Sequence, residues 1–141
     1  MSLMGEAIAA RARSLVGTRF RPQGRDPAYG LDCVGTAAVA VGAPVEAVPR
    51  DYQMRGELLA EMEEGLCDFG CRPVVGTLLR AGDLVVCRAG PSQYHLAVMT
   101  GSGFVHADAR LRLVVERPLP LPWPMVSAWR MASGDYDEGE D

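Results

Sequence analysis

The stretch that decides the fold is Gly30-Leu31-Asp32-Cys33-Val34-Gly35-Thr36-Ala37-Ala38. A glycine-rich loop leads up to Cys33 and an Ala/Val-rich segment follows it, so the pattern predicts a helix that begins near the cysteine. The free N–H groups and the dipole at a helix N-terminus favour negative charge, and we therefore expect them to stabilise a Cys33 thiolate. A thiolate is the form of cysteine that attacks a carbonyl carbon, which makes Cys33 the candidate nucleophile.

The sequence contains two histidines, His95 and His106, and each lies in a strand-like segment downstream of Cys33. Gly101–Gly103 is a hairpin signal between these segments, so the two histidines can be cross-strand neighbours with Cβ atoms within about 5.5 Å. An imidazole beside a thiol acts first as a base and then as an acid. We therefore expect His95 to bond Cys33, and His106 to accept the other ring N–H of His95 and fix its orientation.

Each of these residues also has an ordinary structural interpretation. A single cysteine is usually a small buried hydrophobic residue, and a single histidine in a strand is usually a hydrogen-bonded structural residue. The order Cys33, His95, His106 favours the catalytic interpretation over both. Asp32 is expected to cap the helix or to bond the loop, and the family resemblance given below adds binding of the free amine of a substrate. The backbone N–H of Cys33 is the natural oxyanion donor.

Length and composition indicate one globular domain. The chain has 141 residues, of which 48% are hydrophobic and 23% charged, in the usual range for such domains. The net charge of −4, without a run of basic residues, argues against a nucleic-acid partner. No stretch reaches the ~18 apolar residues that a membrane span needs, so no membrane partner is expected. No secretory signal is visible, and we expect synthesis in the cytoplasm.

The hydrophobic pattern changes its period along the chain. Apolar residues have helical spacing over Gly5–Val16 and Arg55–Leu66, and they alternate with polar residues in short runs after Gly76. Helices followed by strands in this order predict an α+β fold with helices packed on an antiparallel sheet. We assign residues 5–131 to one domain, 1–4 to a leader and the acidic residues 132–141 to a flexible tail. The predicted strands are Asp83–Arg88, Tyr94–Thr100, Gly103–Ala107, Leu111–Glu116 and Met125–Met131.

Three further cysteines carry weaker signals. Cys67 and Cys71 have a spacing compatible with zinc, but no second ligand pair is left once the histidines are used. Two free thiols are therefore favoured, with a disulfide only if the protein is exported. Cys87 lies in a predicted strand and is expected in the core. We expect neither a metal nor a cofactor.

Arginines and tryptophans near the predicted site have two interpretations each. Arg19, Arg21 and Arg25 either hold substrate carboxylates in bidentate fashion or form a solvated face, and Arg21 is our candidate for substrate binding. Trp123 and Trp129 flank the last predicted strand. Core packing is favoured for both, although Trp123 lies among prolines and could line a groove.

Four segments, in order, resemble the NlpC/P60 cell-wall peptidase domain. They are Gly17–Gly35, Ala81–Val86, His95–Met99 and Phe104–Ala107. The Gly-Arg-Asp-Pro insert and the Leu-Asp-Cys-Val-Gly element look most like the subgroup found in phage tails and gene transfer agents. The resemblance extends from about residue 5 to residue 131.

This resemblance implies a papain-like fold and a triad of Cys33, His95 and His106. It implies cleavage of peptidoglycan stem peptides, typically between D-γ-glutamyl and diaminopimelate, and delivery to the cell wall by proteins of a phage tail or gene-transfer particle. Many members carry a tyrosine before the cysteine. Phe20 occupies the nearest position here, and Tyr29 is the alternative substrate contact. An amidase or acyltransferase on the same scaffold, and a non-catalytic tail component, remain open alternatives.

Overall fold

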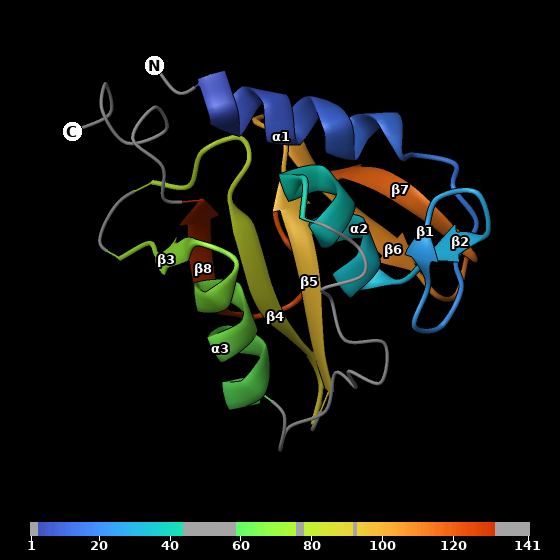
Figure 1. Ribbon diagram of the computed structural model, residues 1–141. Coiled ribbons are helices and arrows are strands. Elements are labelled where there is room, and N and C mark those ends of the chain that lie inside the picture. Colours follow the sequence, from blue (N-terminus) through green and yellow to red (C-terminus); the bar gives the residue numbers. More distant parts are fainter. Residues whose placement is uncertain (1–2, 44–58, 76–77, 92, 132–141) are drawn as a thin grey trace.

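Three helices pack against one face of a six-stranded antiparallel sheet in the computed structural model of the protein (Figure 1). The structure describes residues 3–43, 59–75, 78–91 and 93–131. The helices are α1 (Leu3–Ser14), α2 (Cys33–Val41) and α3 (Leu59–Asp68). The sheet has the order β3-β8-β4-β5-β6-β7. Its strands are β3 (Cys71–Pro73), β4 (Leu84–Gly90), β5 (Gln93–Met99), β6 (Gly103–Asp108), β7 (Leu113–Pro118) and β8 (Met125–Met131). The α+β expectation is therefore confirmed.

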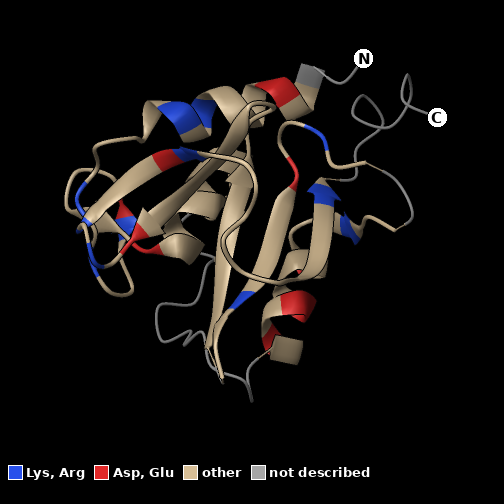
Figure 2. Cartoon of the chain, turned by 180° about the vertical axis from the view of Figure 1, so that it is seen from behind, with Lys and Arg blue, Asp and Glu red and all other residues tan. Residues whose placement is uncertain are grey.

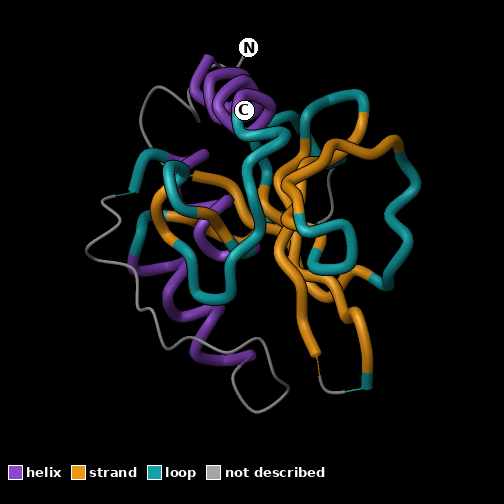
Figure 3. The backbone as a smooth tube through the Cα atoms, turned by 90° about the vertical axis from the view of Figure 1, so that its right-hand side faces the viewer, coloured by secondary structure: helices purple, strands orange, loops and turns teal. Residues whose placement is uncertain are grey.

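Side-chain alternation along the central strands divides the core into two parts. Leu96 and Val98 of β5 face the helices, whereas Ala97 and Met99 belong to a smaller cluster that also contains Phe104. Such alternation is the normal consequence of a strand with apolar residues on both faces. Figure 3 shows the helical layer beside the sheet. β5 carries no Asp, Glu, Lys or Arg, and β6 carries Asp108 at its last position (Figure 2).

A buried ion pair ties β8 to the start of β4. The guanidinium of Arg130 lies 2.8 and 2.9 Å from the two carboxylate oxygens of Asp83, and Asp83 is 0% exposed. The backbone N–H of Arg80 donates to the same carboxylate at 2.7 Å. Bidentate geometry of this kind fixes both orientation and distance. The pair therefore holds the turn that precedes β4 against the C-terminal strand.

Several boundaries differ from the sequence expectation. α3 continues through Gly65 to Asp68, and its expected start at Arg55 lies outside the described residues, as does the expected tail. α1 includes Leu3 and Met4, which we had assigned to a leader. The two-residue strands β1 (Arg25–Asp26) and β2 (Gly30–Leu31) and the short β3 were not predicted, because such lengths give no periodic pattern. None of the helices in the described ranges is both long and apolar enough to cross a membrane.

Candidate active site

Cys33 is the first residue of α2, as the sequence predicts, and Asp32 is the N-cap. The Asp32 carboxylate accepts a hydrogen bond from the N–H of Gly35 at 2.8 Å, the usual geometry of an N-cap. A Cβ atom on Gly35 would lie 2.1 Å from the carbonyl oxygen of Gly24. Glycine is therefore required at position 35, because the loop that carries Gly24 packs directly on the first turn of the helix.

The Asp32 carboxylate is also half of an ion pair behind the nucleophile. Nη1 of Arg25 lies 2.7 Å from Asp32 Oδ1, and the N–H of Gln23 donates to Oδ2 at 3.0 Å. Arg25 is 1% exposed, so it neither holds a substrate carboxylate nor forms a solvated face, and both interpretations are wrong for this arginine. Sequence reasoning missed the pair because nothing in the spacing shows that residue 25 folds back on residue 32.

The sulfur of Cys33 is buried and lies against the backbone of β5. Cys33 is 6% exposed, and its sulfur accepts hydrogen bonds from the backbone N–H groups of Leu96 and Val34. Burial, followed by the negative charge of Asp32, raises the pKa of the thiol to about 12. The expectation of a stabilised thiolate is therefore wrong for the resting protein, because the N–H groups at the helix N-terminus do not outweigh desolvation.

The two histidines contact each other. His95 Nε2 lies 2.9 Å from His106 Nδ1, and the ring planes are nearly perpendicular at 86°. β5 and β6 pair at Val98–Val105 and Met99–Phe104, so the register makes the histidines diagonal neighbours rather than directly opposite ones. Diagonal pairs are within reach of aromatic side chains. The structure thus places His106 where it can orient the His95 ring.

Cys33 reaches β5 beyond the end of this pairing. Leu96 lies past the last β5–β6 pair, and its N–H donates to the Cys33 sulfur. The expected hydrogen bond between Cys33 and His95 is not among those of the described residues, where the hydrogen bond of the His95 ring goes to His106. The sulfur is therefore next to the backbone of the residue that follows His95, and within the described residues the thiol and the imidazole share no hydrogen bond.

Trp123 packs against both histidines. The centroid of its ring system lies 4.9 Å from that of His95 and 5.1 Å from that of His106, in edge-on arrangements. Phe104 adds a further contact to His106 at 5.4 Å. Sequence reasoning considered core packing or a groove for Trp123 and missed this role. The proline-rich segment that carries Trp123 has no periodicity from which its position could be inferred.

Burial keeps His95 neutral near pH 7. Desolvation, followed by the charge of His106, lowers the pKa of His95 to about 4, and Asp108 opposes this shift. Burial also lowers the pKa of His106, whose buried Nε2 has no hydrogen-bond partner among the described residues. In the resting protein the Cys33 thiol and the His95 imidazole are therefore both neutral near pH 7.

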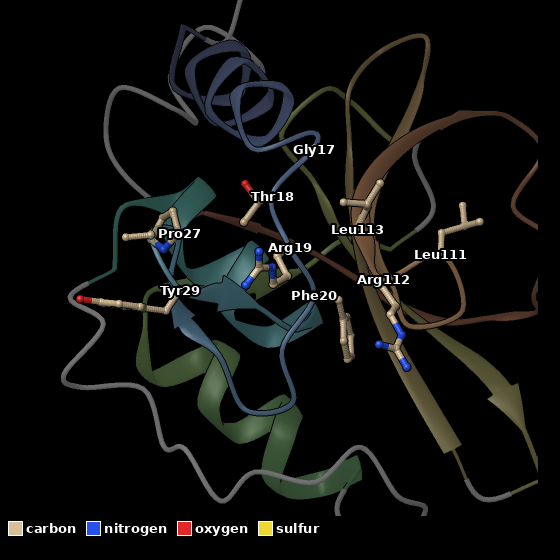
Figure 4. A pocket seen from close by; sticks show the side chains of 10 residues that line it. Gly17, Thr18, Arg19, Phe20, Pro27, Tyr29, Leu111, Arg112 and Leu113 are labelled. Atoms are coloured by element: carbon tan, nitrogen blue, oxygen red, sulfur yellow. The ribbon is translucent and has the colours of Figure 1, made fainter.

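Three further candidates lie around the loop that precedes Cys33. Phe20 and Tyr29 line a groove of about 720 Å³ between the segments 17–20, 27–29 and 111–113 (Figure 4). Arg21 lines a neighbouring hollow of about 330 Å³, which Tyr29 also borders. Phe20 packs against the core cluster that contains Cys33. The structure therefore groups Phe20 and Tyr29 on one surface, and Arg21 lies beside it.

Of the remaining cysteines, Cys87 lies directly opposite His95 in the β4–β5 pairing, whereas Cys67 lies in α3 and Cys71 in β3. Cys67 is exposed and Cys71 buried, and both are free, so the favoured pair of free thiols agrees with the structure. Cys71 Sγ lies 3.5 Å from Met131 Sδ. Cys87 is fully buried, as expected. In the described ranges, no group of three or more His, Cys, Asp or Glu side chains is arranged to hold a metal ion.

The sequence and the structure were each compared with known proteins, and the structural comparison finds proteins of similar fold. No protein-family model matches the sequence, and no curated protein matches it. Among solved structures, the model is similar to NlpC2 from Trichomonas vaginalis, with 17% identity and a TM-score of 0.66 over 91% of this chain and 46% of that one. It is similar to the NlpC/P60 domain of the peptidoglycan hydrolase SagA, with 22% identity and a TM-score of 0.61 over 90% of this chain and 98% of that one.

A third similar structure is the peptidoglycan hydrolase RipB from Mycobacterium tuberculosis, with 20% identity and a TM-score of 0.59 over 92% of this chain and 65% of that one. The chain spans less than half the length of the two Trichomonas vaginalis proteins that it matches. At sequence identities of 17–22%, the similarity to these structures shows a shared fold and nothing further. The protein therefore has the mixed α+β, papain-like fold of NlpC/P60 domains, with its helices packed on an antiparallel sheet.

Proposed function

We propose that this protein is a cysteine peptidase that cleaves peptidoglycan stem peptides, at the bond between D-γ-glutamyl and diaminopimelate. The observation that carries the proposal is the position of Cys33. It begins a helix on the NlpC/P60 fold, and its sulfur lies against the strand of His95, whose Nε2 is 2.9 Å from His106. A nucleophile, a base and a group that orients the base are the parts that amide hydrolysis by a cysteine needs.

The proposed reaction starts from the neutral site. His95 accepts the thiol proton on Nδ1 while the Cys33 sulfur attacks the carbonyl carbon, because the other ring nitrogen of His95 faces His106. The N–H of Cys33 stabilises the oxyanion. The amide C–N bond then breaks, His95 returns its proton to the leaving amine, and a thioester remains on Cys33. Water, deprotonated by His95, attacks the thioester and releases the carboxylic acid and the free thiol.

The neutral state of His95 supports this sequence of steps. His95, whose pKa is lowered to about 4, is unprotonated at pH 7 and has a ring nitrogen available for the thiol proton, while the same lowering makes it a weaker base than an ordinary histidine. His106 acts by holding the His95 ring, and Trp123 limits its movement by packing against it. Because the raised pKa keeps the resting Cys33 thiol protonated at neutral pH, the proton leaves sulfur as the carbon–sulfur bond forms.

The proposal extends to the biological setting. The loop before Cys33 resembles that of peptidases from phage tails and gene transfer agents, so we propose that this protein acts on the cell wall as a component of such a particle. Its partners would then be the particle proteins that carry it to its substrate.

A second candidate is favoured by one observation. Cys33 is 6% exposed and its pKa is about 12, which suits an inert, buried thiol. On that account the protein is a non-catalytic component of the particle that uses the fold for assembly. An amidase or acyltransferase on the same scaffold would use the proposed thioester and differ in the bond that it breaks.

Digestion of purified peptidoglycan separates these candidates. Wild-type protein and the Cys33→Ala variant are incubated with it, and the soluble products are identified by mass spectrometry. The peptidase proposal expects new free amines on diaminopimelate with wild-type protein alone. Peptides released with new N-acetylmuramic acid ends would identify an amidase. No products from either protein, with binding to the cell wall retained, would favour the non-catalytic component.

A further inference from the structure

Three side chains form a row on one face of β6. Val105 and Ala107 belong to the core cluster beneath the helices, whereas Phe104 belongs to the smaller cluster on the other face. Because side chains alternate along a strand, His106 and Asp108 lie on the same face as Phe104. The rings of Phe104 and His106 are in contact, with 5.4 Å between their centroids. Asp108 is therefore the next side chain beyond His106 in this row.

The His106 ring uses one nitrogen for His95 and has a second, buried nitrogen. Its Nδ1 lies 2.9 Å from Nε2 of His95, and its own Nε2 has no hydrogen-bond partner among the described residues. In the proposed reaction His95 takes the thiol proton on Nδ1, so its Nε2–H donates to His106. Neutral His106 then carries its own proton on Nε2. The positive charge on His95 therefore forms beside a ring whose remaining N–H finds no acceptor in the described ranges.

Most groups packed around the two rings are uncharged or already paired. Cys87 on β4 lies opposite His95, and burial raises the pKa of its thiol to about 11. Trp123, which contacts both rings, does not titrate. On α2, the raised pKa of Cys33 keeps its thiol protonated, and the neighbouring Asp32 carboxylate is held in an ion pair. None of these groups offers a free negative charge to the histidine pair.

Two charged side chains act on the histidine pair, and their effects have opposite signs. Desolvation lowers the pKa of His95 and of His106, and the charge of Asp108 opposes this effect in both rings. Arg117 on β7 lowers the pKa of His106 further. Asp108 is held in place, because its Oδ1 accepts the backbone N–H groups of residues 110 and 111 at 2.9 and 3.0 Å. Its carboxylate is thus a fixed negative charge at the end of the row.

We propose that Asp108 is a positioning residue that acts through His106 and stabilises the positive charge formed when His95 accepts the thiol proton. The role rests on the proposed peptidase function and adds a fourth residue to Cys33, His95 and His106. A base weakened by burial needs a nearby negative charge in the transition state, and a fixed carboxylate supplies it without reorganisation. Asp108 is only partly buried, so water screens its charge and keeps the effect modest.

NMR titration of the two histidine rings tests this role without turnover. His95 and His106 are the two histidines of the chain, so their ring signals are readily assigned. The Cys33→Ala protein is titrated from neutral pH downwards, as far as its spectrum stays that of the folded protein. Asp108→Asn removes the charge and keeps an oxygen for the N–H groups of residues 110 and 111. In low salt it should lower the proton affinity of both rings about threefold.

Two further variants and a change of salt serve as controls. Arg117→Gln removes a positive charge and should raise the proton affinity of His106, opposite in sign to Asp108→Asn. At about 1 M salt, where the Debye length is about 3 Å, both differences should largely disappear. Asp26→Asn is the matched control, because Asp26 also accepts a turn N–H, that of Ala28 at 2.9 Å, and lies on β1. It should leave both rings unchanged.

The outcomes separate the role of Asp108 from the proposed activity. Unchanged proton affinities in Asp108→Asn, or a change that high salt leaves intact, would overturn the role whether or not the protein hydrolyses peptides. A salt-sensitive fall, with kcat on a stem peptide about threefold lower and KM unchanged in Asp108→Asn, would support it. The same fall with an unchanged kcat would overturn the role in the reaction. The same fall without hydrolysis by wild-type protein would support the charge coupling and remove the peptidase proposal.

Discussion

His95 and His106 are diagonal neighbours on adjacent strands, two residues out of register, and their facing nitrogens are 2.9 Å apart. The two rings are nearly perpendicular and share Trp123 as a packing partner. His106 is 2% exposed, so its position is set by the sheet and not by solvent. In the mechanism that we propose, His106 is therefore a positioning residue for His95, and His95 transfers the proton.

Replacing His106 tests this division of labour. His106→Ala should lower kcat about 100-fold or more with little change in KM, because the His95 ring loses the group that fixes its tautomer and orientation. Steady-state kinetics on a stem peptide measures both constants. His106→Asn is the matched control, since its amide oxygen can accept the same N–H and should restore part of kcat. A His106→Ala protein within twofold of wild type would show that His95 needs no such partner.

The resting thiol should titrate at high pH. Burial and the charge of Asp32 raise the pKa of Cys33 to about 12, so its alkylation rate by iodoacetamide should keep rising above pH 9, beyond the ordinary cysteine value of about 8.5. Asp32→Asn removes the negative charge and should lower the pKa of Cys33. A plateau of the alkylation rate below pH 8 would contradict the neutral resting site.

The Arg25–Asp32 ion pair should stabilise the folded protein, and Arg25 also offsets the negative charge of Asp32 near the Cys33 sulfur. Arg25→Met leaves the partly buried Asp32 carboxylate beside Gly35 without its cationic partner, which should cost about 2 kcal/mol of unfolding free energy. Urea denaturation measures this loss. The double variant Arg25→Met/Asp32→Asn should recover part of it, because no unpaired charge remains. If the double variant lost as much unfolding free energy as the two single variants together, the two residues would act independently.

The buried ion pair of Asp83 and Arg130 should also stabilise the folded protein, at positions far from Cys33 in the sequence. Arg130→Met removes the bidentate cation from a carboxylate that is 0% exposed, and it should destabilise the fold by about 3 kcal/mol. Thermal unfolding of this variant, compared with Arg117→Met on the exposed part of β7, measures the effect. A similar small loss in both variants would mean that the pair adds no more than a surface arginine does.

Stability should fall in mild acid because of His95. Its pKa is about 4 in the folded protein against 6.5 for an ordinary histidine, so the unfolded chain binds the proton first. The resulting stability is fully present above pH 6.5 and is lost as the pH falls towards 4. Denaturation at a series of pH values measures the slope, and His95→Gln should flatten it in this window. An unchanged slope in that variant would contradict the lowered pKa.

Much of the fold was predictable from local patterns. The alternation of residues in β8 gave its limits, Met125–Met131, without error, and the glycine-rich loop before Cys33 marked the start of α2. The Asp32 cap and the meeting of the two histidines also follow from spacing and a hairpin signal. Interactions between distant segments were not predictable. The partner of Arg25, the contact of Trp123 with both histidines and the place of Arg112 in the groove depend on how separate loops return to the sheet.

The burial of the sulfur was also beyond local reasoning. Helix N-termini lower thiol pKa values in exposed sites, and the sequence alone favoured that outcome. The packing of α2 against β5 and the capping carboxylate of Asp32 reverse the direction of the shift. The balance is decided by tertiary contacts, which no pattern around Cys33 reveals.

Trapping the acyl intermediate tests the central claim most directly. Wild-type protein is mixed with excess stem peptide, quenched in acid within the first turnovers and examined by intact-protein mass spectrometry. The proposed mechanism predicts a mass increase equal to the acyl part of the peptide, located on Cys33 by fragmentation and absent from Cys33→Ala. Unmodified Cys33 with the peptide intact, or hydrolysis that continues in Cys33→Ala, would contradict the assignment of Cys33 as the nucleophile.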